Sequence, residues 1–340
     1  IITDIDLLYL SNKDLKSIVI TGTNGKSTTC KLIAHLLKIN KIKYSLGGNI
    51  GTPILDIKNS NNEIIIIEAS SFQLSHSKFI RPNFALFLNL SNDHLDWHGN
   101  KKNYLNSKLK IFQHQDKNHY AIVNKKFKKI FKRKGFLSKL TLPSEKEYKE
   151  IKNEIKNDYL KSNINDENMS FVYAFAKLIK VGKKSFIDAM SSFKGLPHRF
   201  EIFLKKENFT FINDSKATSF KSTQLALSSL KSIYWILGGL PKKGDKIKIS
   251  RFKKNIIKCY LIGQNINFFK KQLKGKLAYS SAKNLKNSII QIFKDCRVHQ
   301  NSKYNILLSP AAASFDQFKN FEKRGEEFKR LCKIYGRKYI

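Results

Sequence analysis

The stretch ITGTNGKSTT, Ile20–Thr29, decides the fold of this 340-residue chain. A short apolar run, SIVIT at Ser17–Thr21, leads into it, and the segment KSTTCKLIAHLLKIN that follows repeats leucine and isoleucine at helical spacing. Strand, glycine-rich turn and helix in this order open an α/β domain. Because the amides of such a turn and the positive end of the helix both attract anions, we predict a phosphate-binding loop.

The loop is shorter than the common phosphate-binding pattern GxxxxGK(S/T). Ile20 stands where that pattern has its first glycine, so that only GxxGKS remains. We still expect Lys26 to reach the β- and γ-phosphates of a nucleotide and Ser27 to bind magnesium. The simpler alternative is a glycine-rich turn that only caps a helix. The predicted ATP-binding residues of the loop are Gly22, Thr23, Asn24, Gly25, Lys26, Ser27 and Thr28.

Two further apolar runs predict strands that end beside this loop. EIIIIE at 63–68 and FALFLNL at 84–90 are continuous rather than alternating, as in parallel strands that are buried on both faces. Glu68 ends the first run, and the loop after the second run contains His94. Ligands of α/β proteins bind at the carboxyl ends of the strands. We therefore predict that Glu68 and His94 bind metal there; the alternatives are a solvated strand end and an ordinary loop histidine.

After Arg199 a second set of strands and helices alternates. The runs FTFIND, IYWILGG, IKCYLIG and YNILLSP predict strands, with helices from Ser222, near Arg251, before the last strand and at the end of the chain. The predicted fold class is α/β: a central P-loop-type ATPase domain with a parallel sheet at 17–197, then a Rossmann-like doubly wound domain at 198–340. Elsewhere we predict surface strands and loops at 125–161 and helices at 171–181 and 185–193.

The composition limits the partners. Lys and Arg outnumber Asp and Glu by 64 to 26, a formal charge of +38, which by itself is typical of nucleic-acid binding. Lysine is spread along the chain, however, and base readout favours arginine, so we expect neither a nucleic-acid nor a membrane partner. The four cysteines form no CxxC pair and are expected to be buried thiols. No apolar run has the length of a membrane span, and we expect a cytoplasmic monomer.

Six blocks of sequence, in order, resemble the Mur ligase superfamily, and within it the member that adds D-glutamate. They are TGTNGKST, GGNIGTP, EASSFQL, GLPHRFE, NDSKATS and SPAAASFDQFKNFEKRG. The resemblance implies an ATP-dependent acid–D-amino-acid ligase of peptidoglycan precursor synthesis, on which cell-wall growth, cell shape and division depend. Its substrates would be UDP-N-acetylmuramoyl-L-alanine and D-glutamate. ATP would phosphorylate the carboxylate of the first substrate, and the amine of D-glutamate would attack the acyl phosphate.

The resemblance also implies a site for two magnesium ions. Its ligands would be Ser27, Glu68, His94 and Lys108. Lys108 would bind metal after reaction with CO2, because a carbamylated lysine offers a carboxylate-like oxygen. Asn49, in GGNIG, would contact the muramoyl substrate; the alternative is a turn residue in the left-handed conformation. The catalytic residues implied by the resemblance are Lys26, His94, Lys108, Arg199 and Lys216.

In the second domain the resemblance implies a nucleotide contact and an amino-acid pocket. His198 and Arg199 would lie at the hinge, and Asp214 would bind the ribose. Arg199 and Lys216 would lie near the phosphates or the acyl intermediate, and Asn165 of the first domain would also contact ATP. The implied D-glutamate pocket consists of Thr218, Lys242, Ser314, Phe315 and Phe321. Alternatively, Ser314 is a helix cap and Phe321 belongs to the core.

The chain departs from the family pattern in three places. SNIN at 162–165 replaces the GxHN that often precedes the central domain's helix, and Ala312 stands where a cysteine is common. Residues 1–16 are too few for the N-terminal domain that holds UDP, so we expect them to be a remnant of that domain or a linker from it. Binding energy from the remote part of a substrate positions its reacting group. We therefore expect impaired ligase activity, and near-normal turnover would contradict this expectation.

The sequence leaves other functions open. Another Mur ligase or a folylpolyglutamate synthase would share the loop and the domain order, and a preference for meso-diaminopimelate or L-lysine would identify a different Mur ligase. A basic nucleic-acid-binding ATPase would bind with steep salt dependence. The last alternative is a catalytically dead ATP-binding remnant, against which the joint presence of Lys26, Glu68, His94 and Lys108 argues.

Overall fold

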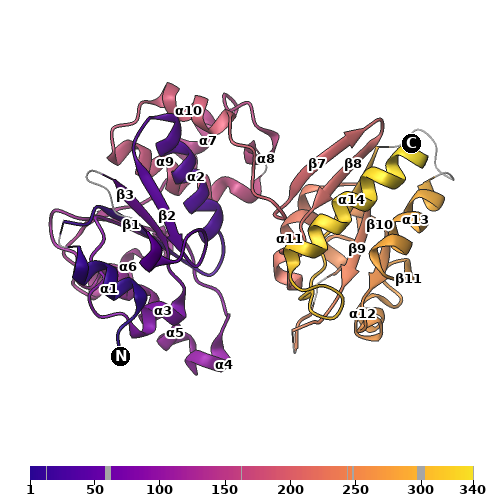
Figure 1. Cartoon of the computed structure of the whole chain (residues 1–340), viewed down its shortest axis with the longest axis horizontal. Helices are drawn as coiled ribbons and strands as arrows, with labels where there is room; N and C mark the ends of the chain where they lie inside the picture. Colours follow the sequence, from indigo (N-terminus) through magenta and orange to yellow (C-terminus); the bar gives the residue numbers. More distant parts are fainter. Residues whose placement is uncertain are drawn as a thin grey trace. The chain divides into compact units, whose positions relative to one another are not determined.

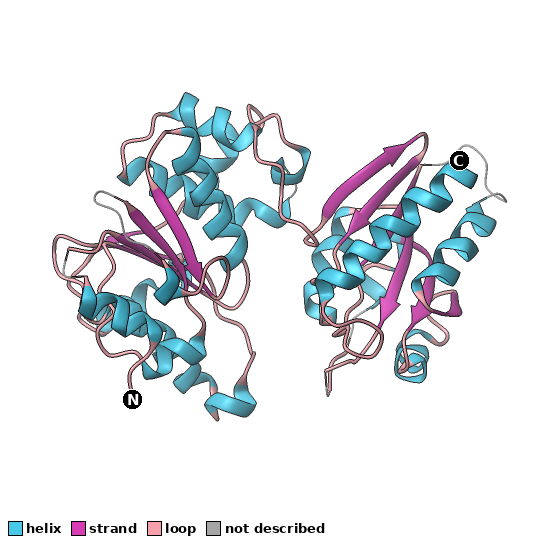
Figure 2. Cartoon of the chain, viewed as in Figure 1, coloured by secondary structure: helices cyan, strands magenta, loops and turns pink. Residues whose placement is uncertain are grey.

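The chain forms two compact units, each built around its own sheet (Figures 1 and 2). The computed structural model describes residues 1–12, 14–57, 63–161, 163–242, 244–246, 249–296 and 303–339. The first unit comprises 1–161 and 165–194, and the second comprises the chain from Gly195 onward together with the short segment that interrupts the first unit before Asn165. This division falls close to the domain boundary predicted near His198.

The first unit is a parallel six-stranded sheet in the order β2-β3-β1-β4-β5-β6. Its strands are β1 (Ser17–Thr21), β2 (Tyr44–Gly48), β3 (Ile64–Glu68), β4 (Phe84–Phe87), β5 (Tyr120–Val123) and β6 (Lys139–Thr141). Its helices are α1 (Asp4–Ser11), α2 (Lys26–Ile39), α3 (Ser71–His76), α4 (Leu95–His98), α5 (Lys101–Leu109), α6 (Lys128–Arg133), α7 (Glu145–Lys152), α8 (Asp158–Lys161), α9 (Asp166–Leu178) and α10 (Lys183–Ser191).

Helices cover both faces of this sheet, which explains its continuous apolar strands. Val19 of β1 packs in one core with Ile5 of α1 and Leu74 of α3. Its neighbours Ile18 and Ile20, which point to the opposite face, are equally buried. Helices α2, α9 and α10 contact one another, and Figure 1 shows them across the sheet from α1, α3 and α5. A strand between two layers of helices needs apolar residues at every position.

The second unit is a six-stranded sheet in the order β11-β10-β9-β12-β8-β7. Its strands are parallel except β7, which is antiparallel to β8. The strands are β7 (Glu201–Lys206), β8 (Phe209–Asn213), β9 (Ile233–Gly238), β10 (Ile256–Ile262), β11 (Tyr279–Lys283) and β12 (Tyr304–Leu308). The helices are α11 (Phe220–Ser229), α12 (Ile266–Leu273), α13 (Leu285–Cys296) and α14 (Phe321–Tyr339).

Alternate residues of the second sheet enter two separate cores. Trp235 of β9 packs with residues of α11 and α12. Tyr234, one position earlier on the same strand, packs with residues of α13 and α14. Two helices therefore cover each face, and the predicted α/β fold class with two doubly wound sheets is confirmed.

The structure corrects several element predictions. No α-helix lies near Arg251, where the described residues form only the short 3-10 turns Ile249–Arg251 and Lys253–Asn255. Segment 125–161 is largely helical, containing α6, α7 and α8, and its only described strand is β6, so the prediction of surface strands and loops there is wrong. Helices α1, α3, α4 and α5 and strands β2, β5, β7 and β11 were not predicted. Strands β2, β7 and β11 lie at sheet edges, where a short half-exposed segment lacks a continuous apolar pattern. Strand β5 is an inner strand, but its apolar run has only four residues.

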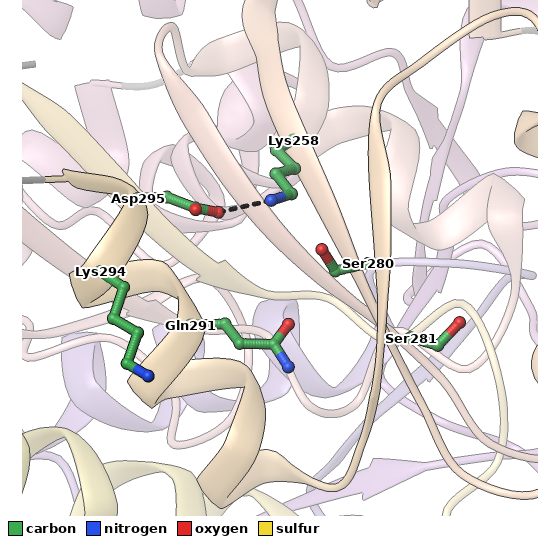
Figure 3. Close-up of a pocket in the computed structure, with 6 residues that line it drawn as sticks. All are labelled: Lys258, Ser280, Ser281, Gln291, Lys294 and Asp295. Atoms are coloured by element: carbon green, nitrogen blue, oxygen red, sulfur yellow. Dashed lines mark hydrogen bonds and ion pairs between the residues drawn. The ribbon is translucent and has the colours of Figure 1, made fainter. Parts of the chain in front are cut away.

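Three further findings concern the whole described chain. All four cysteines are buried free thiols, as predicted. Among the described residues no helix is both long and apolar enough to cross a membrane. A polar pocket of about 340 Å³ lies in the second unit beside β10, β11 and α13 (Figure 3), where Asp295 accepts a 2.7 Å hydrogen bond from Lys258. None of its lining residues belongs to the predicted site.

Candidate active site

The carboxyl ends of four neighbouring strands bring the predicted residues of the first unit together. Ile20 of β1 lies beside Glu68 of β3, which in turn pairs with Gly48 of β2. On the other side, Thr21 of β1 pairs with Phe87 of β4. The loops that follow these strands therefore leave the sheet at one edge, at the position where ligands of α/β proteins bind.

The phosphate-binding loop requires glycine at Gly25. This residue begins α2 with a left-handed φ of 84°. A Cβ atom there would lie 2.2 Å from Oδ1 of Asn168, in the first turn of α9. Conformation and space both exclude a side chain. Ser27 and Thr28 follow in the buried first turn of α2.

Two lysines converge on one carbonyl of the loop. Lys26 Nζ donates to the carbonyl oxygens of Gly22 at 3.0 Å and Thr23 at 3.1 Å. Lys108 Nζ, carried by α5, donates to the same Gly22 oxygen at 2.9 Å. By composition alone Lys108 is one surface lysine among many, and only the family resemblance singled it out; in the structure it is 1% exposed. The pKa of Lys108 is lowered to about 7, chiefly by burial and also by the charge of Lys26, against the opposing effect of Asp93.

Tyr104 and His98 support Lys108, and the predicted site residues did not include them. The Tyr104 hydroxyl lies 3.1 Å from Thr23 Oγ1, and its ring lies under Lys108 Nζ at 4.7 Å. The ring of His98 is tilted against that of Tyr104, with ring centroids 5.0 Å apart, and its Nε2 lies 3.0 Å from Ser71 Oγ. Burial, followed by the charges of His94 and Lys108, lowers the pKa of His98. The i, i+4 spacing of Tyr104 and Lys108 on one helix was the available signal.

Glu68 is a buried carboxylate with one oxygen unsatisfied. Its side chain is 2% exposed, which excludes the solvated strand end. Oε1 accepts from Asn49 Nδ2 at 3.2 Å, whereas Oε2 has no hydrogen-bond partner in the described structure. Asn49 also donates its backbone N–H to the Glu68 carbonyl at 2.9 Å. Asn49 is not in the left-handed conformation; Gly48 and Gly51 adopt it instead, so that alternative for Asn49 is wrong.

His94 lies on the loop after β4, at the start of α4. It adopts a left-handed φ of 54°, and its Nε2 lies 3.6 Å from Asp93 Oδ2. Its ring packs edge-on against Phe72. Within the described ranges, no three His, Cys, Asp or Glu side chains form a ready cluster for a metal ion. Any metal ligand set would therefore have to include other donors or a modified residue.

Asn165 is placed away from solvent. It is 1% exposed, and its Nδ2 donates to the Tyr159 carbonyl at 2.8 Å. Asn168, one helical turn later on α9, is the residue that faces Gly25 and accepts from Thr29 Oγ1 at 3.4 Å. Ser162 is the first residue of the SNIN segment, which differs from the family pattern, and it lies outside the described residues.

In the second unit, Asp214 follows β8 at the carboxyl edge of its sheet. Oδ2 accepts from Ser309 Oγ at 2.7 Å, and Oδ1 accepts from the Phe200 N–H at 3.1 Å. Burial raises the pKa of Asp214 to about 7, while these two hydrogen bonds and the charge of Arg199 act in the opposite direction. Asp214 is therefore held in place by neighbours from two other segments.

His198 connects the start of the second unit to β8. Its Nδ1 lies 2.9 Å from Asn213 Nδ2, and its carbonyl accepts from the Lys216 N–H at 3.1 Å. Its own N–H donates to Glu201 Oε2 at 2.9 Å. Burial lowers the pKa of His198. These bonds fix the backbone on both sides of Arg199 and Asp214.

The residues predicted for the amino-acid pocket differ in their surroundings. Lys216 Nζ lies 4.4 Å above the Phe321 ring, and Phe321 is partly exposed at the start of α14 rather than in the core. Ser314 is 2% exposed with no partner for its hydroxyl in the described structure, and the helix begins later, so it is not a cap. Phe315 is 70% exposed. Thr218 is partly exposed and Lys242 is exposed.

Arg324 joins two loops of this edge, and the prediction did not include it. Its Nε donates to Ser215 Oγ at 3.0 Å, and its Nη2 donates to the carbonyls of Ser215 at 2.8 Å and Ala312 at 3.0 Å. Ser215 lies between Asp214 and Lys216, and Arg324 is 1% exposed. The sequence did contain a signal for its burial: Arg324 lies four and eight residues before the buried Phe328 and Cys332, and so on the apolar face of the same helix.

We predict that Arg324→Lys lowers the unfolding free energy of the second unit by about 2 kcal/mol. The reason is that one ammonium group cannot replace the planar guanidinium, which donates to a hydroxyl and two carbonyl oxygens. Urea unfolding is followed by the fluorescence of the buried Trp235, in a Trp97→Phe background. Arg330→Lys, on the exposed face of the same helix, is the control, and we expect it to change stability by less than about 0.5 kcal/mol. Equal midpoints for the two variants would contradict the prediction.

Comparisons with known proteins show the family of this chain. Residues 20–190 match the Mur ligase middle domain. The chain is 38% identical over 355 residues to the "UDP-N-acetylmuramoylalanine--D-glutamate ligase" of Rickettsia felis, covering 98% of this chain and 78% of that protein. The protein of the same name from Rickettsia prowazekii is 38% identical over 353 residues, with 98% and 79% covered.

A solved structure shares the fold. The MurF ligase of Thermotoga maritima, solved in complex with ADP, aligns with a TM-score of 0.67 over 97% of this chain and 83% of that one. At 15% sequence identity this likeness concerns the fold alone. The family match and the two close relatives carry the assignment, and from them it follows that this chain belongs to the Mur ligase family.

Proposed function

We propose that this chain is an ATP-dependent ligase that joins D-glutamate to UDP-N-acetylmuramoyl-L-alanine, a step in the synthesis of peptidoglycan precursors. The observation that carries the proposal is the similarity to ligases of that name over 98% of the chain. The geometry supports it, because Lys26, Lys108 and Glu68 gather at one sheet edge around a phosphate-binding loop.

The loop would bind the triphosphate of ATP. The amides of Gly22, Thr23, Asn24 and Gly25 and the start of α2, with Ser27 and Thr28, form an anion site at a helix N-terminus. Lys26 now rests on two loop carbonyls, and a bound phosphate would offer it a charged acceptor instead. In the second unit Asp214 would hold the ribose, and Asn165 would support the nucleotide from the buried start of α9.

The residues at this edge fit a magnesium ion. Glu68 Oε2 is a buried carboxylate oxygen without a partner, and a cation would compensate its charge. Ser27, His94 and Lys108 would complete the ligands, Lys108 as a carbamate. A bound magnesium ion would supply charge neutralisation where the carboxylate of the substrate meets the triphosphate. Lys108 suits carbamylation because its lowered pKa leaves a neutral amine near pH 7, and only the neutral amine reacts with CO2.

The proposed reaction has two covalent steps. The carboxylate of UDP-N-acetylmuramoyl-L-alanine attacks the γ-phosphorus of ATP, and ADP leaves with the electrons of the broken P–O bond. The neutral amine of D-glutamate then attacks the acyl phosphate carbon to form a tetrahedral intermediate. The nitrogen gives up one proton, and inorganic phosphate leaves with that proton and the electrons of the broken C–O bond. Lys26, Arg199 and Lys216 would offset the negative charge that develops in these steps. Asn49, which binds Glu68, would contact the muramoyl substrate.

D-glutamate would bind in the second unit. It carries two carboxylates, which need cations and hydrogen-bond donors. Lys242 and Thr218 would supply them, together with the hydroxyl of Ser314 and the backbone N–H of Phe315. The Ser314 hydroxyl is buried without a partner and is thus available to a ligand. Phe321, beside Lys216, would form the apolar wall.

The test is phosphate release from ATP by the purified chain, with magnesium and bicarbonate. We expect release only when UDP-N-acetylmuramoyl-L-alanine and D-glutamate are both present. In a panel with meso-diaminopimelate, L-lysine and L-glutamate, we expect D-glutamate to be preferred about a hundred-fold or more, since a ligand that leaves the buried Ser314 hydroxyl unpaired loses binding energy. Preference for a diamino acid would identify a different Mur ligase, and release that requires nucleic acid would identify the other class. The predictions of a cytoplasmic monomer without nucleic-acid or membrane partners stay predictions.

A further inference from the structure

A clamp of three hydrogen bonds holds the phosphate-binding loop to the end of β4. The clamp residue is Asn89, directly after Leu88. Its side-chain Oδ1 accepts from the Asn24 N–H at 2.9 Å, and its Nδ2 donates to the Asn24 carbonyl at 3.2 Å. Its backbone carbonyl accepts from the Thr23 N–H at 3.0 Å. Three consecutive peptide groups of the loop are thus held by one residue.

The clamp works in only one orientation of the Asn89 amide. If the amide were turned over, Nδ2 would face the Asn24 N–H and Oδ1 would face the Asn24 carbonyl, and neither pair can form a hydrogen bond. Glu167, in the first turn of α9, selects the correct orientation, because its Oε2 accepts from the second N–H of Asn89 Nδ2 at 2.7 Å. A carboxylate only accepts hydrogen bonds, so it holds the nitrogen on its own side.

The other oxygen of Glu167 is fixed as well. Oε1 accepts from Asn124 Nδ2 at 2.8 Å, at the carboxyl end of β5. Asn124 is held in turn, because its Oδ1 accepts from the Lys126 N–H at 3.1 Å. Glu167 therefore lies between two amide donors and uses both oxygens. A glutamine has one oxygen and could satisfy only one of them.

The placement of this carboxylate is unusual for its surroundings. It lies close to a loop that is built to bind a polyanion, where a negative charge by itself weakens binding. Burial also raises the pKa of Glu167, against the hydrogen bonds from Asn89 and Asn124, so the position disfavours its charge. A carboxylate at a site where electrostatics alone opposes it would be explained if it holds the loop in the conformation that binds phosphate.

We propose that Glu167 is a positioning residue for ATP, acting through Asn89 to hold the Thr23 and Asn24 peptides in the conformation that binds phosphate. The inference rests on the proposed function, because it takes ATP as the ligand of the loop. It adds a second residue of α9, after Asn168, to those that surround the loop between β1 and α2.

The test compares Glu167→Ala and Glu167→Gln with Asp166→Asn. Asp166 is the neighbouring acid in the first turn of α9, but it pairs with Lys152 and does not contact Asn89, so its substitution removes the same charge without releasing the clamp. Two quantities are measured on the full chain: hydrogen exchange of the loop amides without nucleotide, and the Kd of ATP with magnesium. Circular dichroism melting checks that each variant is folded.

We expect Glu167→Ala to speed exchange of the Asn24 amide and to raise the Kd of ATP, each by about ten-fold, the size of one lost hydrogen bond to a charged group. Glu167→Gln is expected to be intermediate, because Asn124 can turn its amide over at the loss of the Lys126 bond. Asp166→Asn should leave loop exchange within about two-fold of the unaltered chain and should not raise the Kd. If charge alone mattered, all three variants would bind ATP more tightly.

A double variant tests the route through Asn89. Since Glu167 acts only by orienting Asn89, Glu167→Ala combined with Asn89→Ala should raise the Kd no more than Asn89→Ala alone. Additive effects, or unchanged loop exchange in folded Glu167→Ala, would overturn the inference. If the unaltered chain does not bind ATP, the proposed function fails, while the exchange measurement without nucleotide still decides whether Glu167 positions the loop.

Discussion

Lys108→Ala is expected to lower phosphate release at least about a thousand-fold relative to the unaltered chain, because it removes a proposed metal ligand at the point where charge develops. Acetate or formate should restore part of the activity, since a small carboxylate can enter the space left by the carbamate. The measurement is phosphate release at saturating substrates, with and without the added carboxylate. Lys102→Ala, on the exposed surface of α5, is the control and should remain fully active.

The carbamate of Lys108 should also be directly visible. In 13C-labelled bicarbonate we expect one protein carbamate signal, absent from Lys108→Ala and present in Lys102→Ala. With a pKa of about 7, Lys108 is mostly protonated at pH 6 and about nine-tenths neutral at pH 8, so at constant dissolved CO2 the signal should grow over this range. A signal that first appeared near pH 10, as for an ordinary lysine, would contradict the prediction.

The low pKa of Lys108 has a matching effect on stability. Its folded-state pKa of about 7 lies below the ordinary value of 10.5. Between these values the unfolded chain binds more protons, so this group makes folding more favourable as pH rises from about 7 to 10.5. In bicarbonate-free buffer, Lys108→Met should therefore stabilise the chain most at pH 6, and the gain should shrink by pH 9. Thermal unfolding at the two pH values measures this difference.

Glu68→Gln is expected to lower phosphate release at least about a hundred-fold at millimolar magnesium, with partial recovery at higher magnesium. The substitution keeps the shape of the side chain and the oxygen that binds Asn49, but it removes the negative charge. Stability should move in the opposite direction. A buried carboxylate oxygen without a partner is costly, so we expect the unfolding free energy of the chain without nucleotide or metal to rise by roughly 1 kcal/mol.

The control for Glu68 lies on the same segment. Glu63, just before β3, is at the opposite end of the strand, where its carboxylate accepts from Ser45 Oγ. Glu63→Gln should leave the magnesium dependence of phosphate release unchanged. Release and its magnesium dependence are measured for both variants, and urea unfolding is followed by circular dichroism. Unchanged activity in Glu68→Gln, or equal losses in the two variants, would show that Glu68 does not bind the metal.

The parts of the fold that could be predicted are those with strong local signals. The strand Ser17–Thr21, the loop and α2 were predicted almost to the residue, because apolar runs and glycines act over a few positions. The helix expected near Arg251 and the edge strands were not, since a short half-exposed segment depends on its neighbours in the sheet. Local pattern thus gave the inner strands other than the four-residue β5, and the edge strands required the assembled sheet.

The candidate site shows the same division. The sequence by itself determined the phosphate-binding loop, the alternation of strands and helices, and, through its motifs, the family to which the chain belongs. Only the tertiary structure decided that Lys108, on α5, is buried against the loop and that Glu68 has an unsatisfied oxygen. It also decided that Arg324 and Glu167 hold loops that are far from them in sequence. The physical reason is that burial, pKa and hydrogen-bond partners are properties of a side chain's surroundings, and these surroundings come from segments that only folding brings together.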